Sequence, residues 1–121
     1  MIKAAKFGGS SLADAAQFQK VKRIVESDPT RTVVVVSAPG KRNKDDHKIT
    51  DLLYLCHAHL KYGVSYESIF SMVEERYRAI KEGCGIALDL DAEFIALKNQ
   101  MNKEISIDYL VSRGEYLAAK L

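Results

Sequence analysis

The feature that most limits how this chain can fold is an apolar strand that leads directly into a glycine turn. The turn reads Lys6-Phe7-Gly8-Gly9-Ser10-Ser11, and a helical pattern follows it. Two glycines let the backbone turn sharply and approach a ligand closely, while the free N–H groups and the dipole at the start of a helix attract anions. Lys6 adds a mobile positive charge. The pattern predicts a phosphate-binding turn, and an ordinary tight turn with a solvated lysine is the alternative.

The next strand makes the architecture more specific. Residues 32–38 are a continuous, mostly β-branched run, which is typical of a strand covered on both faces. Strand, helix and strand in this order predict a parallel pair with a right-handed crossover. The carboxyl ends of both strands then meet at one edge of the sheet, where open α/β sheets bind their ligands. We therefore expect Gly8, Gly9, Ser37 and Ala38 at the same edge.

Periodicity and capping signals predict the helices. The first begins at a capping box of Ser11 and Asp14 and ends at the turn of residues 28–30. The later helices are expected from Thr50 to Gly63, from Ser65 to Gly83, from Asp89 or Asp91 through Ile105, and from Ile107 to Leu121. Because two strands do not form a stable sheet alone, further strands are expected beyond Leu121 or from another chain. The predicted fold class is α/β, a parallel sheet with flanking helices that is incomplete in this chain, with a helical second half.

The composition argues against several classes of protein. With 47% hydrophobic and 28% charged residues among 121, the chain has the make-up of one soluble globular domain. No apolar run approaches the roughly 20 residues that cross a bilayer. The start carries no secretory signal pattern, which predicts a cytoplasmic protein. A net charge of +2, from 18 basic and 16 acidic residues, is too balanced to predict nucleic-acid binding.

Other polar features favour structural roles. Residues 41–48 combine basic and acidic side chains with almost no apolar ones, which predicts a mobile, solvated loop rather than a nucleic-acid site. Cys56 and Cys84 lack metal-ligand spacing and are expected to be free thiols. His57 and His59 point to different faces of a helix, so no zinc or other metal site is predicted.

Four segments, taken together, resemble aspartate kinases of the amino-acid kinase superfamily. They are Lys6-Phe7-Gly8-Gly9-Ser10-Ser11, Val33-Val34-Val35-Val36-Ser37-Ala38-Pro39-Gly40, Thr50-Asp51-Leu52-Leu53 and Ser112-Arg113-Gly114-Glu115, in the family's order. The resemblance implies a carbamate-kinase-like fold in which residues 1–121 are the amino-terminal part of a kinase domain. It also implies that the rest of that domain, and regulatory domains of the ACT type, are absent from this chain.

The resemblance implies roles for individual residues. Lys6 corresponds to the family's essential catalytic lysine. The phosphates of ATP are bound by Lys6, Phe7, Gly8, Gly9 and Ser10. Ser37 lies near the transferred phosphoryl group or substrate, Thr50 binds aspartate, and Glu115 binds the α-ammonium group of aspartate.

Each of the substrate residues also has a structural alternative. Ser37 fits a plain turn residue, Thr50 fits a helix N-cap, and Glu115 fits a solvated helix carboxylate. Gly114 is a stronger signal, because an interior helix glycine costs about 1 kcal/mol relative to alanine. It predicts a close approach by a ligand or by a neighbouring strand.

The implied activity is ATP-dependent phosphorylation of the β-carboxylate of L-aspartate, the first step toward lysine, threonine and methionine. The resemblance implies ATP and Mg²⁺ as cofactors, L-aspartate and ATP as small-molecule partners, neither nucleic acid nor membrane as partners, and a homo-oligomer for the complete protein. The 121 residues alone are expected to be inactive, because the family's nucleotide-binding residues lie in the absent part. The alternatives are a superfamily kinase acting on glutamate, carbamate or a nucleotide, and a non-catalytic module that binds aspartate or phosphate.

Overall fold

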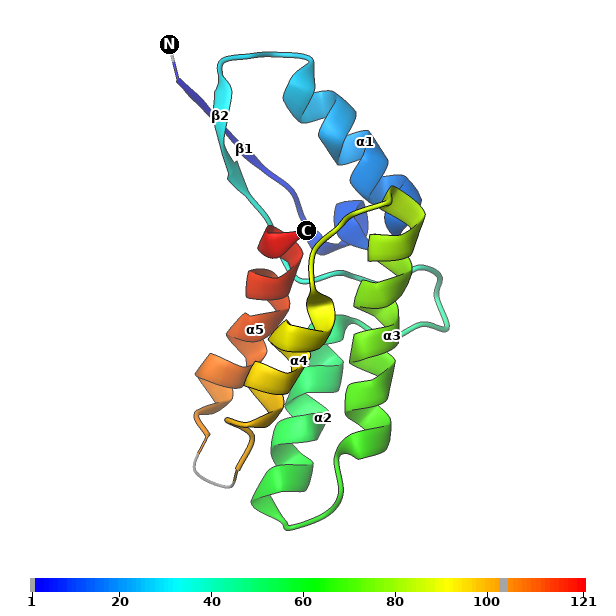
Figure 1. Ribbon diagram of the computed structural model, residues 1–121, viewed down its shortest axis with the longest axis vertical. Coiled ribbons are helices and arrows are strands. Elements are labelled where there is room, and N and C mark those ends of the chain that lie inside the picture. Colours follow the sequence, from blue (N-terminus) through cyan, green and yellow to red (C-terminus); the bar gives the residue numbers. More distant parts are fainter. Residues whose placement is uncertain (1, 103–104) are drawn as a thin grey trace.

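The computed structural model describes residues 2–102 and 105–121, with a pair of strands at one end and a bundle of helices at the other (Figure 1). In chain order the elements are β1 (Lys3–Lys6), the short 3-10 helix η1 (Gly9–Leu12), α1 (Ala15–Glu26), β2 (Arg31–Val35), α2 (Ile49–Lys61), α3 (Glu67–Cys84), α4 (Leu90–Lys98) and α5 (Ile107–Lys120). The described part is therefore a mixed α/β structure whose two strands form one sheet, as the sequence predicts in outline.

The strands β1 and β2 pair in parallel, which confirms the prediction from the strand, helix and strand order. Ala5 lies opposite Val34 and Lys6 opposite Val35, and α1, which connects the strands, contacts β2. The expectation that the second strand is covered on both faces is wrong for the described chain. Val33, Val34 and Val35 are 47%, 41% and 47% exposed, because a sheet of two strands and one helix leaves much of their surface in water.

The first helix begins later than predicted. The turn after β1 continues as η1, which contains Ser11, and α1 begins only at Ala15. The Asp14 carboxylate caps α1 by accepting a hydrogen bond from the Gln17 N–H at 3.0 Å. The predicted capping box with Ser11 is therefore wrong, whereas the helix does end just before the predicted turn at residues 28–30.

The boundaries of α2 and α3 also differ from the predicted ones. Lys48 occupies the N-cap position of α2, so Thr50 lies in the first turn of the helix and is not its cap. The helix α3 continues through Gly83 and ends at Gly85, whose φ of 65° lies in the left-handed region that favours glycine. A glycine stop was predicted here, but at the wrong one of two neighbouring glycines.

The fourth helix is shorter than predicted. The Asp89 carboxylate caps α4 by accepting a backbone N–H at 3.1 Å, and the helix ends at Lys98. The predicted helix extended through residues 103–104, which lie outside the described residues. After them, the Ser106 hydroxyl caps α5 by accepting a backbone N–H at 3.3 Å.

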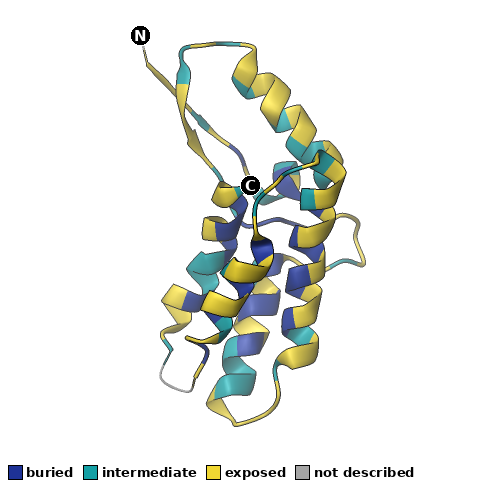
Figure 2. Cartoon of the chain, in the orientation of Figure 1, coloured by how far each residue is buried: buried dark blue, intermediate teal, exposed yellow. Residues whose placement is uncertain are grey.

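The hydrophobic core lies among the helices and not against the sheet. Figure 2 shows the buried residues gathered where the helices of the bundle face one another, whereas the strands and α1 are largely exposed. Phe70 and Phe94 meet edge to face with ring centroids 6.2 Å apart, and Tyr77 is fully buried beside them. None of the helices in the described part of the chain combines the length and hydrophobicity that a bilayer span requires.

Candidate functional site

The ends of β1 and β2 meet at one edge of the sheet, where backbone contacts hold the turns that follow them. The Gly40 N–H donates to the Gly9 carbonyl oxygen at 2.8 Å, and the Phe7 N–H donates to the Val35 carbonyl oxygen at 2.9 Å. A Cβ at Gly9 would lie 2.9 Å from the Ala38 carbonyl oxygen, closer than real Cβ contacts. The predicted meeting of the glycine turn with the residues after the second strand is confirmed.

The glycine turn is open at Gly8. Nothing lies within 4 Å of the position that a Cβ on Gly8 would take. Lys6 and Ser10 are exposed on either side, and within the described residues the Lys6 ammonium has no ion pair or hydrogen bond. Phe7 is only 9% exposed and anchors the turn. The arrangement offers a free positive charge beside an accessible backbone, which suits an anionic ligand.

The sequence predicts that the dipole of the first helix acts at the glycine turn, and this is wrong for α1. The helix begins at Ala15, several residues after Gly9, and the Asp14 carboxylate already occupies its end. The reason is the intervening η1, which turns the chain before α1 starts. An anion at the turn would therefore meet Lys6 and the local backbone rather than the end of an α-helix.

Gly114 in α5 joins this edge to the helical bundle. A Cβ at Gly114 would lie 2.8 Å from the Ala38 Cβ and 3.3 Å from both Ile49 Cγ2 and Leu53 Cδ1. The Tyr77 hydroxyl donates to the Gly114 carbonyl oxygen at 2.7 Å, which fixes α5 against α3. The predicted close approach at Gly114 is confirmed, but the groups that approach are the turn after β2 and one face of α2 rather than a neighbouring strand.

The three predicted substrate residues each lie one position along the chain from this contact. They are Ser37 before Ala38, Thr50 after Ile49, and Glu115 after Gly114. Ser37 and Thr50 are half-buried, and Glu115 is exposed. In the described part of the chain their side chains form no hydrogen bond with one another or with any other residue. The fold brings their backbones together and leaves their polar groups free.

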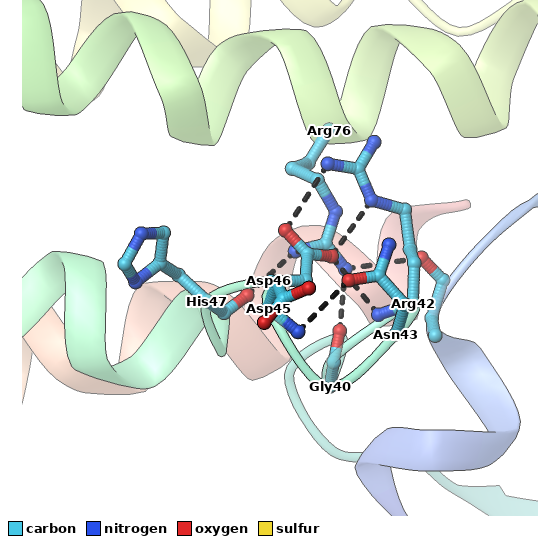
Figure 3. Close-up of polar contacts among 8 residues, drawn as sticks. Gly40, Arg42, Asn43, Asp45, Asp46, His47 and Arg76 are labelled. Carbon is cyan, nitrogen blue, oxygen red and sulfur yellow. Dashed lines mark hydrogen bonds and ion pairs between the residues drawn. The ribbon is translucent and has the colours of Figure 1, made fainter.

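The sequence analysis did not predict the polar contacts of Arg76, which hold the loop at residues 41–48 in place (Figure 3). The Asp46 carboxylate accepts hydrogen bonds from Arg42 Nε at 2.7 Å and Arg42 Nη2 at 3.1 Å, and it pairs with Arg76 Nη1 at 3.3 Å. The sequence predicts a loop that is mobile and solvated throughout, and this is wrong, because Asp46 and the His47 carbonyl oxygen bind Arg76 of α3. One signal was available: Arg76 follows Val73 by three residues and precedes Ile80 by four, so it shares the apolar face of α3.

The charges in this cluster stabilise one another. Hydrogen bonds from the Arg42 side chain hold the pKa of the Asp46 carboxyl well below its usual range, although burial opposes the shift. Burial lowers the pKa of the Arg76 guanidinium, and the charge of Asp46 counteracts this. The same carboxylate raises the pKa of Arg42. All three groups are charged at neutral pH, so the cluster carries one net positive charge.

At the sheet edge, the side chains that the structure describes form no cluster that could hold a metal ion. No group of three or more histidine, cysteine, aspartate or glutamate residues comes together in residues 2–102 and 105–121. A hollow of about 200 Å³ lies away from the edge, between α4 and α5. Arg113 lines it between the rings of Tyr109 and Tyr116, with its guanidinium carbon 4.4 Å and 4.6 Å from their centroids.

Comparison with known proteins gives a consistent set of relatives. No family model matches the chain. It is 40% identical to Aspartokinase 3 of Bacillus subtilis (strain 168) over an alignment of 126 positions, which covers 99% of this chain and 28% of that protein.

Solved structures of the same kind of protein share the fold of this chain. The Clostridium acetobutylicum aspartate kinase structure superposes with a TM-score of 0.91 at 47% identity, over 94% of this chain and 26% of that one. The structure of E. coli aspartokinase III in complex with aspartate and ADP superposes with a TM-score of 0.75 at 25% identity, over 99% of this chain and 27% of that one. The chain thus spans about a quarter of the relatives it matches. These similarities relate it to aspartokinases.

Proposed function

We propose that this chain is part of an ATP-dependent aspartate kinase, which transfers the γ-phosphoryl group of ATP to the β-carboxylate of L-aspartate. In this proposal residues 1–121 form the amino-terminal part of a kinase domain with the amino-acid kinase fold. The complete protein is then a cytoplasmic homo-oligomer that acts on the route to lysine, threonine and methionine. The aspartate and ADP bound in the E. coli relative support this choice of substrates.

The observation that carries the proposal is the meeting of the glycine turn, the turn after β2, the start of α2 and the middle of α5 at one edge. Close contacts link them in series, from Gly9 to Ala38 and from Ala38 to Gly114 and Ile49. Phosphoryl transfer depends mainly on holding two reactants in line and on neutralising charge. An edge with a free lysine at one end and a free carboxylate at the other suits a nucleotide and an amino acid.

On the phosphate side, Lys6 is the proposed catalytic residue. Its unpaired ammonium can neutralise the charge that spreads over the transferred group, and the open backbone at Gly8, Gly9 and Ser10 can donate N–H groups to phosphate oxygens. The side chain of Phe7 is buried and so anchors the turn in the fold.

On the acceptor side, Glu115 is proposed to bind the α-ammonium group of aspartate. Its carboxylate is exposed and has no partner among the described residues, so it is available for a charge-assisted hydrogen bond. Thr50 and Ser37 offer hydroxyl groups that can donate to the carboxylates of the substrate. Thr50 is free for this task because it does not cap α2.

The proposal also includes Mg²⁺, but the described residues do not fit a dedicated site for it, since no three acidic, histidine or cysteine groups come together there. Magnesium that is bound mainly through substrate phosphates and water needs few protein ligands. No step proposed for this chain depends on the ion.

The exposed valines of β2 favour a larger sheet. Val33, Val34 and Val35 present apolar surface that further strands of a kinase domain would cover, and the relatives are about four times as long as this chain. We therefore expect the 121 residues alone to have no kinase activity. ADP release by the pure chain would contradict that expectation.

Aspartate-dependent ADP release by the full-length protein tests the proposal, with glutamate and UMP as alternative acceptors. Turnover with aspartate alone is expected, together with a severe loss of kcat in Lys6→Ala. Lys20→Ala is the matched control, because Lys20 is an exposed lysine on α1, away from the turn, and should leave kcat unchanged. Turnover with glutamate or UMP would favour another superfamily kinase, and binding without turnover would favour a non-catalytic module.

A further inference from the structure

Arg76 is a buried cation that contacts backbone oxygens of three separate segments. Its side chain is 4% exposed. One terminal nitrogen, Nη2, donates to the carbonyl oxygens of Ala13, at 3.0 Å, and Gly40. The other, Nη1, donates to the His47 carbonyl oxygen at 2.8 Å. The first acceptor follows η1, and the other two lie near the two ends of the loop between β2 and α2, so one residue of α3 joins two loops at three points (Figure 3).

Asp46 completes the set of acceptors. Its carboxylate pairs with Arg76 Nη1 at 3.3 Å and accepts the backbone N–H of Arg42 at 2.9 Å. Both terminal nitrogens of the guanidinium thus have acceptors, whereas the buried Nε has no hydrogen-bond partner among the described residues. The planar, forked geometry of arginine is what reaches all of them, since a lysine ammonium presents three donors from a single point.

The joined segments are those that carry the proposed site. Three pairs, each three residues apart along the chain, link a candidate site residue to an Arg76 acceptor: Ser10 with Ala13, Ser37 with Gly40, and Thr50 with His47. Glu115, on α5, is placed by a different contact, that of Gly114 with Ala38, and Lys6 is placed by the pairing of β1 with β2. A shift of Arg76 would therefore move the phosphate side and the acceptor side of the edge relative to each other.

We propose, resting on the kinase function above, that Arg76 is a positioning residue for phosphoryl transfer, which fixes η1, the turn after β2 and the start of α2 in register without contacting either substrate. In-line transfer requires the reacting groups to be held within a fraction of an ångström, and a misplacement of about 1 Å costs on the order of 100-fold in rate. A residue that is merely structural would change stability and leave the rate per folded molecule unchanged.

The test is steady-state ADP release by the full-length protein carrying Arg76→Lys, at a temperature at which circular dichroism shows the variant to be folded. We expect kcat per folded molecule to fall about 100-fold, with the KM values for ATP and aspartate changed by less than about threefold. Arg78→Lys is the matched control, because Arg78 lies two residues along the same helix with its side chain 45% exposed. It should retain the wild-type kcat.

Asp46→Asn gives a second variant if Arg76→Lys does not fold. It removes the negative charge of the carboxylate that pairs with both Arg76 and Arg42, and it should lower kcat by about tenfold. Hydrogen exchange of peptides covering residues 8–14 and 38–50 should be faster in the same variant, with the peptides of α5 unchanged. If the wild type is active and every folded variant keeps its kcat, the positioning role of Arg76 is contradicted and the proposed function still stands. A full-length wild type without aspartate-dependent turnover contradicts the proposed function, and this role with it.

Discussion

At the scale of single residues, the two adjacent glycines of the turn have different physical reasons to be there. Gly8 has a φ of −77°, which any residue can adopt, and open space where a Cβ would project. Gly9 instead lies against the turn after β2, where a Cβ would be 2.9 Å from the Ala38 carbonyl oxygen and 3.3 Å from the Gly40 nitrogen. Gly9 therefore allows the close packing of the two turns, whereas the open side of Gly8 suits the approach of a ligand.

This difference predicts opposite results for two neighbouring substitutions. Gly9→Ala should lower the free energy of unfolding by about 1–3 kcal/mol, because backbone atoms cannot move aside as easily as a side chain. Gly8→Ala should change it by less than about 0.5 kcal/mol. Urea denaturation of both variants measures the two values side by side. Equal effects, or a larger effect at Gly8, would contradict the proposed division of roles.

At the scale of elements, the sequence was sufficient where the signal is local or repeated. The parallel pair, the order of the helices and the close approach at Gly114 were all predictable from periodicity and from a glycine inside a helix. The ends of the helices were not, because the local pattern does not show that Ser11 belongs to η1 and that Asp14 alone caps α1. Arg76 was missed because its acceptors lie in loops 29 to 63 residues away.

The packing of α5 on α2 gives a prediction at this scale. Gly114→Ala would place a Cβ 2.8 Å from the Ala38 Cβ, and such overpacking costs about 1–3 kcal/mol against a gain of about 1 kcal/mol in helix propensity. The net effect should be a loss of up to about 2 kcal/mol in the free energy of unfolding. Ala79→Gly, at an exposed position in the interior of α3, measures the propensity contribution alone. A Gly114→Ala protein more stable than wild type would contradict the close packing.

At the scale of the whole molecule, polar contacts and close packing both hold the bundle against the strand pair. The core belongs to the helices, and Val33, Val34 and Val35 of β2 remain exposed. Between the two parts, the ion pairs of Asp46 with Arg42 and Arg76 hold the long loop that leads from β2 to α2. The stability of the described fold should therefore respond to the charge of one carboxylate.

That dependence can be measured as a function of pH. Because the pKa of Asp46 is lowered in the folded state, its contribution is fully present above the unfolded value of about 3.9 and is lost as the pH falls toward the folded value. Asp46→Asn should be less stable than wild type at pH 7 and should lose less further stability between about pH 5 and pH 2. Asp45→Asn, at the exposed neighbouring position, should follow the wild-type curve. Parallel curves for wild type and Asp46→Asn would exclude this contribution.

The most direct test of the central claim, that the edge holds aspartate beside a phosphate turn, is the KM for aspartate in full-length protein carrying Glu115→Ala. Loss of a charge-assisted hydrogen bond worth about 1.5–3 kcal/mol should raise the KM by roughly 10- to 150-fold, with the KM for ATP unchanged. Glu82→Ala, at an exposed carboxylate on α3, is the control. An unchanged KM for aspartate in Glu115→Ala would contradict the placement of the substrate at this edge.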